Sequence, residues 1–407
     1  MMFSKKAPIA VHLYSIILAL YAGIWTITTM FLMVSPTFQN VMSSLYLGLA
    51  FIWIGVTLFT GGRYLMISKV VLMMLVVCAS AYFLTVHFSV YRPSVTFLIF
   101  TCMTLLALLF IQVEINTRTF LLTSMLIPII GLPYIPTLIL LVGQGDALGM
   151  GSSYAFLLPA ISTIIYFLKY IEQDKRLIKF SILALMTINL IYIILIISSG
   201  SRGVVLSIFL AILSIYLIPY DDSNQGIRIK KKRTILFLII AIITLNYFWD
   251  ILEWIISILN GMGVSFYALD RTIEYHKVGN VLTGRDAIIE QAWTGICERP
   301  FLGHGISTFS DYVNATTPYI HNSVYQLLFD GGLVLFLLIL YPLFVSMKHW
   351  INKCSYSDYT LMVTLFGASV PGSLFSHDLW NLPILWMFIG YALRFFKKSS
   401  RNFISTY

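Results

Sequence analysis

Charged residues are scarce in this sequence. Aspartate, glutamate, lysine and arginine make up only 11% of its 407 residues, while 59% are hydrophobic. Soluble globular proteins carry about 25% charged residues, so this balance excludes a soluble globular protein. Apolar runs of about 18 or more residues, long enough to cross a bilayer as helices, recur along the chain. The composition therefore predicts an all-α, polytopic membrane protein.

Patterns for binding metals or cofactors are also missing. The 4 cysteines are scattered and predict neither a disulfide pair nor a zinc site. His276, His304 and Asp311 match no metal-ligand spacing. We therefore expect no metal and no cofactor. The sequence also has no internal repeat and no Gly/Ser-rich linker that would divide it into separate domains.

Hydropathy predicts about twelve membrane spans. The first is too long for the core of a signal peptide and is expected to remain uncleaved. The fifth contains Pro128, Pro133 and Pro136, which predict a kink or break because proline removes a helical hydrogen bond. The predicted spans are 10–34, 41–60, 66–88, 94–112, 119–142, 154–171, 179–198, 201–219, 234–259, 329–347, 357–376 and 380–396.

Basic residues predict how these spans are oriented. All but six of the 26 lysines and arginines fall in segments on the same side as the N-terminus, which predicts that both termini are cytoplasmic. The domains expected are spans one to nine over 1–259, a large periplasmic loop with amphipathic helices over 260–328, and spans ten to twelve over 329–407. The net charge of +9 thus requires no nucleic-acid partner. The six exceptions are Arg92, Arg202, Arg271, Lys277, Arg285 and Arg299.

Two of these outer arginines begin predicted helices. Arg202 lies between Ser201 and Gly203, and Arg285 follows Gly284 ahead of an amphipathic helix predicted over 285–297. A cation at a helix N-terminus opposes the helix dipole, so an anion should offset it. Free N–H groups and a bidentate guanidinium together suit a phosphate group. The alternative is an arginine that only extends toward the membrane interface; we favour the phosphate site.

His321 begins a third helix, predicted to run through Gly331 and Gly332 into the tenth span. A helix N-terminus disfavours the imidazolium form, so the ring should stay neutral and able to accept a proton. Further candidates for contacts with a sugar, or for orienting the histidine, are Asn322, His304, Tyr319 and Arg299. His377 and Asp378, in the last outer turn, are either a second polar contact or a solvated hairpin, and the hairpin is favoured.

Taken together, these segments resemble the bacterial O-antigen ligase and Wzy-type O-antigen polymerase superfamily. The resemblance rests on SRG at 201–203, TGR…W…RPFLGHGISTF at 283–309, HN at 321–322 and GG at 331–332, in a chain of many spans with one large late outer loop. It implies a fold like that of the GT-C glycosyltransferases. It also implies a location in the bacterial inner membrane with the active site on the periplasmic side.

The resemblance implies roles for three residues. Arg202 and Arg285 would hold the pyrophosphate of an undecaprenyl-pyrophosphate-linked oligosaccharide donor, and His321 would deprotonate the hydroxyl of a glycan acceptor. The first outer loop, 35–40, has no carboxylate, so a metal-independent reaction is expected. Partners implied are the lipid-linked donor, the glycan acceptor, the bilayer, a chain-length regulator and a flippase.

Three functions remain open at this point. The favoured function is a polymerase that joins lipid-linked repeat units. The first alternative is a ligase that transfers the glycan to the lipid A core. The second is a transporter or flippase of lipid-linked oligosaccharide, which should carry ionisable residues midway in its spans. The predicted spans are nearly free of charge and their polar residues gather on one side, so an enzyme is favoured over a transporter.

Overall fold

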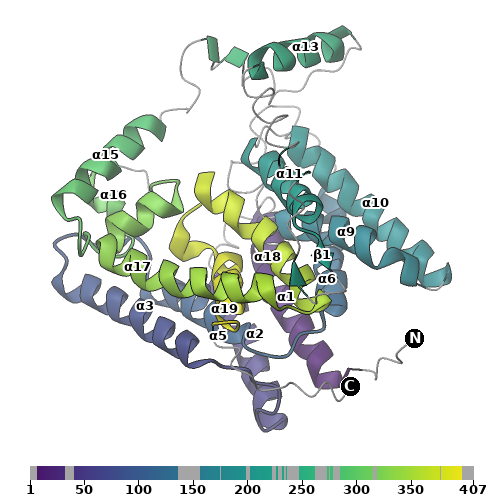
Figure 1. The fold of residues 1–407 in the computed structure, drawn as a ribbon, viewed down its shortest axis with the longest axis horizontal. Helices are drawn as coiled ribbons and strands as arrows, with labels where there is room; N and C mark the ends of the chain where they lie inside the picture. The colour runs from purple at the N-terminus through teal and green to yellow at the C-terminus, as the bar shows by residue number, and fades with distance from the viewer. Residues whose placement is uncertain are drawn as a thin grey trace.

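A computed structural model describes most of the chain. The described residues are 7–32, 41–135, 156–174, 176–198, 202–221, 226–227, 232, 235, 247–261, 273–274, 276–277, 285–314, 319–375 and 377–396. Among them the only sheet is a pair of two-residue strands, β1 (Tyr220–Asp221) and β2 (Gly226–Ile227). The rest of the regular structure is helical, which confirms the all-α prediction (Figure 1).

The described helices form a central bundle, with α13 (Phe248–Gly261) and α15 (Arg285–Glu298) outside it (Figure 1). They are α1 (Ile9–Leu32), α2 (Val41–Phe59), α3 (Lys69–Phe88), α4 (Phe97–Phe100), α5 (Leu106–Phe110), α6 (Thr117–Leu126), α9 (Leu157–Lys169), α10 (Arg176–Ser198), α11 (Arg202–Leu217), α13 (Phe248–Gly261), α15 (Arg285–Glu298), α16 (Phe309–Tyr312), α17 (Ser323–Asn352), α18 (Tyr356–Phe375) and α19 (Pro383–Leu393). Of the described helices, α1, α2, α3 and α17 are long and apolar enough to cross a membrane. The count of about twelve spans stays a prediction.

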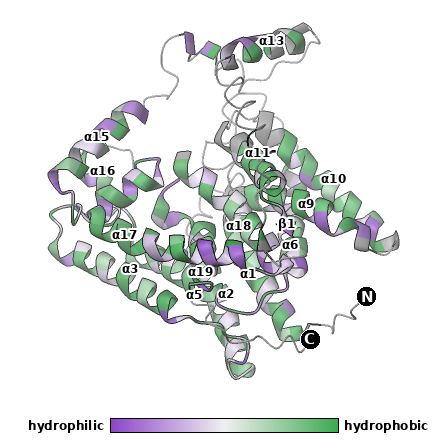
Figure 2. Cartoon of the chain, in the orientation of Figure 1, coloured by the Kyte–Doolittle hydropathy of each residue, from purple (hydrophilic) through white to green (hydrophobic). Residues whose placement is uncertain are grey.

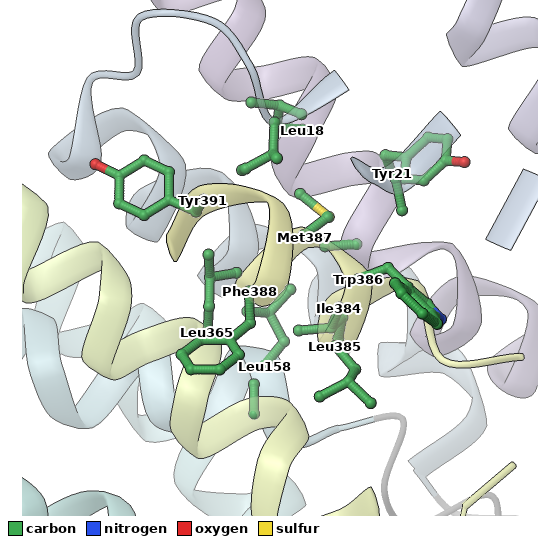
Figure 3. Close-up of a cluster of buried hydrophobic side chains, with 14 of the residues drawn as sticks. Leu18, Tyr21, Leu158, Leu365, Ile384, Leu385, Trp386, Met387, Phe388 and Tyr391 are labelled. Carbon is green, nitrogen blue, oxygen red and sulfur yellow. The ribbon is translucent and has the colours of Figure 1, made fainter. Parts of the chain in front are cut away.

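The last helix, α19, lies at the centre of the bundle. Every residue from Pro383 to Leu393 is buried, so this helix is apolar around its whole circumference. Figure 3 shows its side chains in one buried cluster with Leu18 and Tyr21 of α1, Leu158 of α9 and Leu365 of α18. The outer surfaces are apolar as well. Exposed Leu, Val and Phe residues line α3 and α17, which suits helices that face lipid (Figure 2).

Polar connections gather at the two ends of the bundle. At one end, hydrogen bonds join segments predicted to be cytoplasmic: Met66 N to Gln112 O (2.8 Å), Thr117 Oγ1 with Ser357 Oγ (2.6 Å) and Tyr220 OH to Cys354 O (3.1 Å). At the other end, they join segments predicted to be periplasmic: Ser94 N to Ser307 O (2.8 Å) and Asn322 Nδ2 to Leu374 O (3.0 Å). Each set of contacts therefore joins segments that are predicted to lie on the same side, and the orientation itself stays a prediction.

Two spans are irregular. The fifth changes from α6 to a 3-10 helix over Ile127–Tyr134, which contains Pro128 and Pro133, so the α-helix ends where the prolines predicted a kink or break. Pro136 lies outside the described residues. The fourth span has a π-helical turn over Thr101–Leu105, which the sequence did not predict. Such turns widen a helix locally, and here the Thr104 hydroxyl donates to the Trp380 carbonyl at 3.0 Å.

Helix α17 is broken at Gly332, where the sequence predicted a continuous helix. Gly332 has φ 59° and ψ −164°, a conformation that is essentially limited to glycine. In a continuous helix, the N–H groups of Leu333 and Val334 would donate to the carbonyls of Phe329 and Asp330. The break opens both of these hydrogen bonds. Four polar backbone groups must therefore find other partners.

The segment 300–305, which we call the clasp, supplies those partners. Leu333 N donates to Pro300 O (2.8 Å) and Val334 N to Phe301 O (3.1 Å). In return, the Phe329 carbonyl accepts from His304 N (2.8 Å) and the Asp330 carbonyl accepts from Gly305 N (2.8 Å). The clasp thereby gives each of the four backbone groups a new hydrogen-bond partner, and it fixes the outer loop on α17.

Candidate active site

His321 directly precedes the cap of α17. Its backbone is left-handed (φ 59°), which is uncommon for a residue other than glycine. The next residue, Asn322, caps the helix: its Oδ1 accepts from Val324 N (3.0 Å) and Tyr325 N (3.2 Å). The half-buried ring of Tyr319 lies 4.4 Å from the His321 ring, measured between centroids. The chain therefore holds the His321 imidazole at the positive end of the helix dipole.

The start of α17 is tied to the end of α18. Asn322 Nδ2 donates to Leu374 O (3.0 Å), and Ser323 Oγ donates to Ser373 O (2.9 Å). Because both the oxygen and the nitrogen of its side-chain amide form hydrogen bonds, Asn322 positions α17. A contact between Asn322 and a sugar remains a prediction. These ties fix His321 relative to the turn that follows α18.

That turn carries His377 and Asp378, both buried, so it is not the solvated hairpin that the sequence favoured. The His377 ring lies 4.9 Å from the Trp25 ring of α1, in an edge-on arrangement. Burial, and to a lesser extent the positive charge of His321, lower the pKa of His377 to about 3. His377 thus belongs to the turn whose preceding residues, Ser373 and Leu374, are tied to the start of α17.

Asp378 is fixed by three donors. It accepts from Gln326 Nε2 (2.5 Å), from Trp380 N (3.1 Å) and from Asn381 Nδ2 (2.6 Å). Burial raises the pKa of Asp378 to about 6, and the hydrogen bonds from Gln326 and the Trp380 backbone oppose that rise. Nearby, Trp380 Nε1 donates to Asp330 Oδ2 at 2.5 Å. This polar network is built into the packing between α17 and the turn.

A signal for this network is present in the sequence but was missed. Asn322, Gln326 and Asp330 are spaced four residues apart and so lie on one face of α17. Polar side chains at that spacing in an otherwise apolar helix predict a polar partner on the facing segment. The partner is the His377–Asp378 turn.

Arg202 begins α11 at the same end of the bundle as His321. Tyr220, just after α11, packs against Tyr356 at the start of α18, with ring centroids 5.5 Å apart. A Cβ on Gly367 would lie 2.6 Å from Ala211 Cβ, so the middles of the two helices touch and they run antiparallel. Arg202 lies about 13 Å of helix before Ala211, which places its backbone level with the end of α18. Its side chain lies outside the described atoms.

Arg285 is the first residue of α15, as predicted, and is half-buried. This helix runs to Glu298 and ends before Pro300, close to the predicted range 285–297. It packs on α17 through a small cluster that includes Ala292, Ile296 and Phe329. Arg299 follows the helix and is exposed. The described contacts attach α15 to the helix that begins beside His321, and binding of phosphate by Arg285 stays a prediction.

His304 lies in the packed interior of the outer loop. Its Nε2 is 2.8 Å from the Gly295 carbonyl, and its ring stacks on Phe329 with centroids 4.7 Å apart. Burial lowers the pKa of this imidazole, an effect that the hydrogen bond to Gly295 partly offsets. Because only 3% of the residue is exposed, packing accounts for its position, and a sugar contact stays a prediction.

Comparison with known proteins finds a family match over part of the chain. Residues 187–340 match the model of a family described as O-antigen ligase, a stretch that contains Arg202, Arg285, the clasp and His321. None of the curated proteins compared with the chain matches it. The match and the apolar helices support a membrane protein with an enzymatic role. The match over residues 187–340 thus supports the resemblance to the O-antigen ligase and polymerase superfamily that the sequence motifs indicated.

Proposed function

We propose that this protein is an O-antigen polymerase. It joins undecaprenyl-pyrophosphate-linked repeat units by glycosyl transfer without a metal, at the periplasmic face of the bacterial inner membrane. The observation that carries the proposal is the family match over 187–340, which includes the two arginines and the histidine that the sequence singles out. The proposed domains remain spans over 1–259 and 329–407 with the periplasmic loop over 260–328.

His321 is the proposed general base. A neutral imidazole accepts the proton of the acceptor hydroxyl while the oxygen forms a bond to the anomeric carbon of the donor sugar. The bond from that carbon to the pyrophosphate breaks, and undecaprenyl pyrophosphate leaves. The position of His321 at a helix N-terminus supports this role, because the dipole disfavours a permanent imidazolium.

Arg202 and Arg285 are the proposed ligands of the pyrophosphate. Each is the first residue of a helix, where the N–H groups of the first turn are without helical partners. A guanidinium beside these groups offers bidentate donors to phosphate oxygens, whose charge grows as the leaving group departs. The position of Arg202 at the end of the bundle where His321 lies supports a shared site.

A ligase is the second candidate, because the matching family is described by that activity. The two functions differ in the acceptor. In a strain that lacks the gene, loss of a polymerase should leave core capped with one repeat unit. Loss of a ligase should leave uncapped core and accumulated lipid-linked polymer. Loss of a flippase should instead leave the lipid-linked unit on the cytoplasmic side.

A transfer assay on the purified protein tests the proposal directly. Wild-type protein in detergent, given only undecaprenyl-pyrophosphate-linked repeat unit, should produce a ladder of longer lipid-linked glycans. A ligase should give no ladder, and should form a single new glycosidic bond to lipid A core when that acceptor is added. Absence of any new glycosidic bond with either acceptor would refute both functions.

A further inference from the structure

Two exposed apolar side chains, Phe301 and Leu302, form the tip of the clasp. Phe301 is 65% exposed and Leu302 is 76% exposed. The carbonyls of Pro300 and Phe301 accept hydrogen bonds from α17, so the backbone of the clasp tip lies on the helix while its side chains extend away from it. A single exposed apolar residue is ordinary, whereas a pair that continues a larger apolar surface indicates contact with a partner.

That larger surface is one face of α17. Beyond the break, exposed apolar residues recur at helical spacing along one side, and the residues of the opposite side are buried in the bundle. The first two exposed residues, Leu333 and Val334, are also those whose N–H groups donate to the clasp. The clasp tip therefore extends a surface that suits lipid. The exposed face consists of Leu333, Val334, Leu337, Leu338, Tyr341 and Phe344, each 40–71% exposed.

The other side of the clasp lies against the end of α3. The His304 carbonyl accepts from Ser89 Oγ (2.6 Å), and Ile306 N, directly after the clasp, donates to Thr85 Oγ1 (2.8 Å). Next to these contacts, Phe88 is 76% exposed. Figure 1 shows the chain between α15 and α16 beside the ends of α3 and α17. The clasp thus joins two helices whose exposed faces both suit lipid, at the same end of each.

The length of α17 places the clasp tip at the edge of the hydrocarbon. From Leu333 to Met347, the residue before the exposed Lys348, the helix is about 22 Å long at about 1.5 Å per residue. The hydrocarbon core of a bilayer is about 30 Å thick. The apolar face beyond the break is therefore too short to cross the core alone, and a tilt of the helix shortens its reach further. The leaflet must extend to the level of the break, where the clasp tip lies.

The backbone and charges of the clasp suit this level. Irregular backbone is tolerated at membrane depth where its polar groups have partners. Besides the bonds to α17, Gly303 N donates to Arg299 O (3.0 Å) and the Gly305 carbonyl accepts from Thr308 Oγ1 (2.9 Å). Arg299, directly before the clasp, is exposed, and a cation beside an apolar tip is attracted to the phosphates of anionic lipids.

We propose that the clasp tip is a membrane anchor: Phe301 and Leu302 insert at the acyl-chain boundary of the leaflet nearest to them. The occupant of this surface is bilayer lipid, because the surface continues the lipid-suited faces of α17 and α3. The anchor holds the end of α15 at the membrane surface, and with it the helix that begins at Arg285. The inference concerns how the outer loop is held and is independent of the reaction that the protein catalyses.

Site-directed spin labelling tests this anchor on the full chain in vesicles of phosphatidylcholine and phosphatidylglycerol. Cys297 is exposed, whereas the other three cysteines are buried. In a Cys297→Ser background, Phe301→Cys and Leu302→Cys each place one nitroxide label at the clasp tip. Collisions of the label with oxygen, which concentrates in hydrocarbon, are then compared with collisions with a water-soluble nickel chelate.

The labels at 301 and 302 should collide more often with oxygen than with the chelate. The ratio should place them about 5–10 Å into the boundary between headgroups and acyl chains. Leu337→Cys, on the exposed face of α17, is the control for a deeper lipid position. Gln291→Cys, at an exposed polar position of α15, is the matched control for water and should collide mainly with the chelate.

Each outcome decides the inference. Labels at 301 and 302 that collide with the chelate as often as the label at 291 overturn it, because the clasp tip then lies in water. Labels shielded from both reagents also overturn it, in favour of a protein occupant such as a second copy of the chain. If the cysteine variants do not fold, the unaltered protein is irradiated in vesicles that contain phosphatidylcholine with a photoreactive acyl chain. Cross-links to Phe301 or Leu302 then support the anchor, and their absence overturns it.

Discussion

Replacing Gly332 by alanine should release the clasp from α17. The φ of 59° and ψ of −164° at this position suit only glycine. An added Cβ would lie 2.3 Å from both the carbonyl carbon and the oxygen of Phe301, which are backbone atoms and not the flexible end of a side chain. The clasp must therefore move away, and the hydrogen bonds from Leu333 to Pro300 and from Val334 to Phe301 should be lost.

The expected cost is about 2–6 kcal/mol. Strain in a backbone region reserved for glycine costs about 1–3 kcal/mol. Each of two lost hydrogen bonds contributes about 0.5–1.5 kcal/mol net. The cost should fall on the docking of the clasp, because α19 and the rest of the core lie outside the contact. Local opening should thus become roughly 30-fold to 10⁴-fold more populated.

Hydrogen exchange at two amides measures this change. His304 N and Gly305 N donate to α17 only while the clasp is docked, so both should exchange faster in Gly332→Ala. The matched control is Gly48→Ala in α2, where an added Cβ meets nothing within 4 Å and exchange at the clasp should be unchanged. Wild-type protection of both amides in Gly332→Ala would refute the description of the break.

Three further predictions concern the site. Arg202→Lys and Arg285→Lys should each lose most polymer formation, because lysine keeps the charge but not the bidentate guanidinium. The control Arg63→Lys, at an exposed position, should keep normal polymer formation. Near-normal product from Arg202→Lys and Arg285→Lys at normal protein levels would remove these two arginines from the site. A reporter inserted near Asn314 should read periplasmic, and a cytoplasmic reading would reverse the proposed orientation. The pKa of His377 is lowered to about 3 in the folded protein and is about 6.5 in the unfolded chain, so the contribution of this histidine to stability should be lost as pH falls below about 6.5. His377→Phe should therefore reduce the fall of the unfolding temperature with falling pH. An unchanged dependence on pH would contradict the burial of His377.

Local patterns predicted most of the helices. The span predicted at 66–88 is Lys69–Phe88, and that predicted at 201–219 is Arg202–Leu217. These segments are apolar over their full length, so hydropathy alone places them. The prolines likewise predicted the irregular fifth span. No comparable local pattern predicts the π-helical turn at Thr101–Leu105, because its packing depends on segments far along the chain.

The site was only partly predictable, for the same reason. Each of Arg202, Arg285 and His321 begins a helix or directly precedes its cap, as local spacing indicated. The break at Gly332 depends on a backbone exchange with residues about thirty positions earlier, which no local pattern contains. The burial of His377 depends on Trp25, more than three hundred residues away.

Turnover by purified His321→Gln tests the central claim most directly. Wild-type protein should extend undecaprenyl-pyrophosphate-linked repeat units, and the glutamine variant should be slower by about 10²–10⁴-fold, because it can accept a hydrogen bond but cannot take the acceptor proton. It should still bind the lipid-linked donor, since the base is not needed to hold the pyrophosphate. Near-wild-type turnover by His321→Gln would contradict the assignment of His321 as the base and, with it, the mechanism proposed for this site.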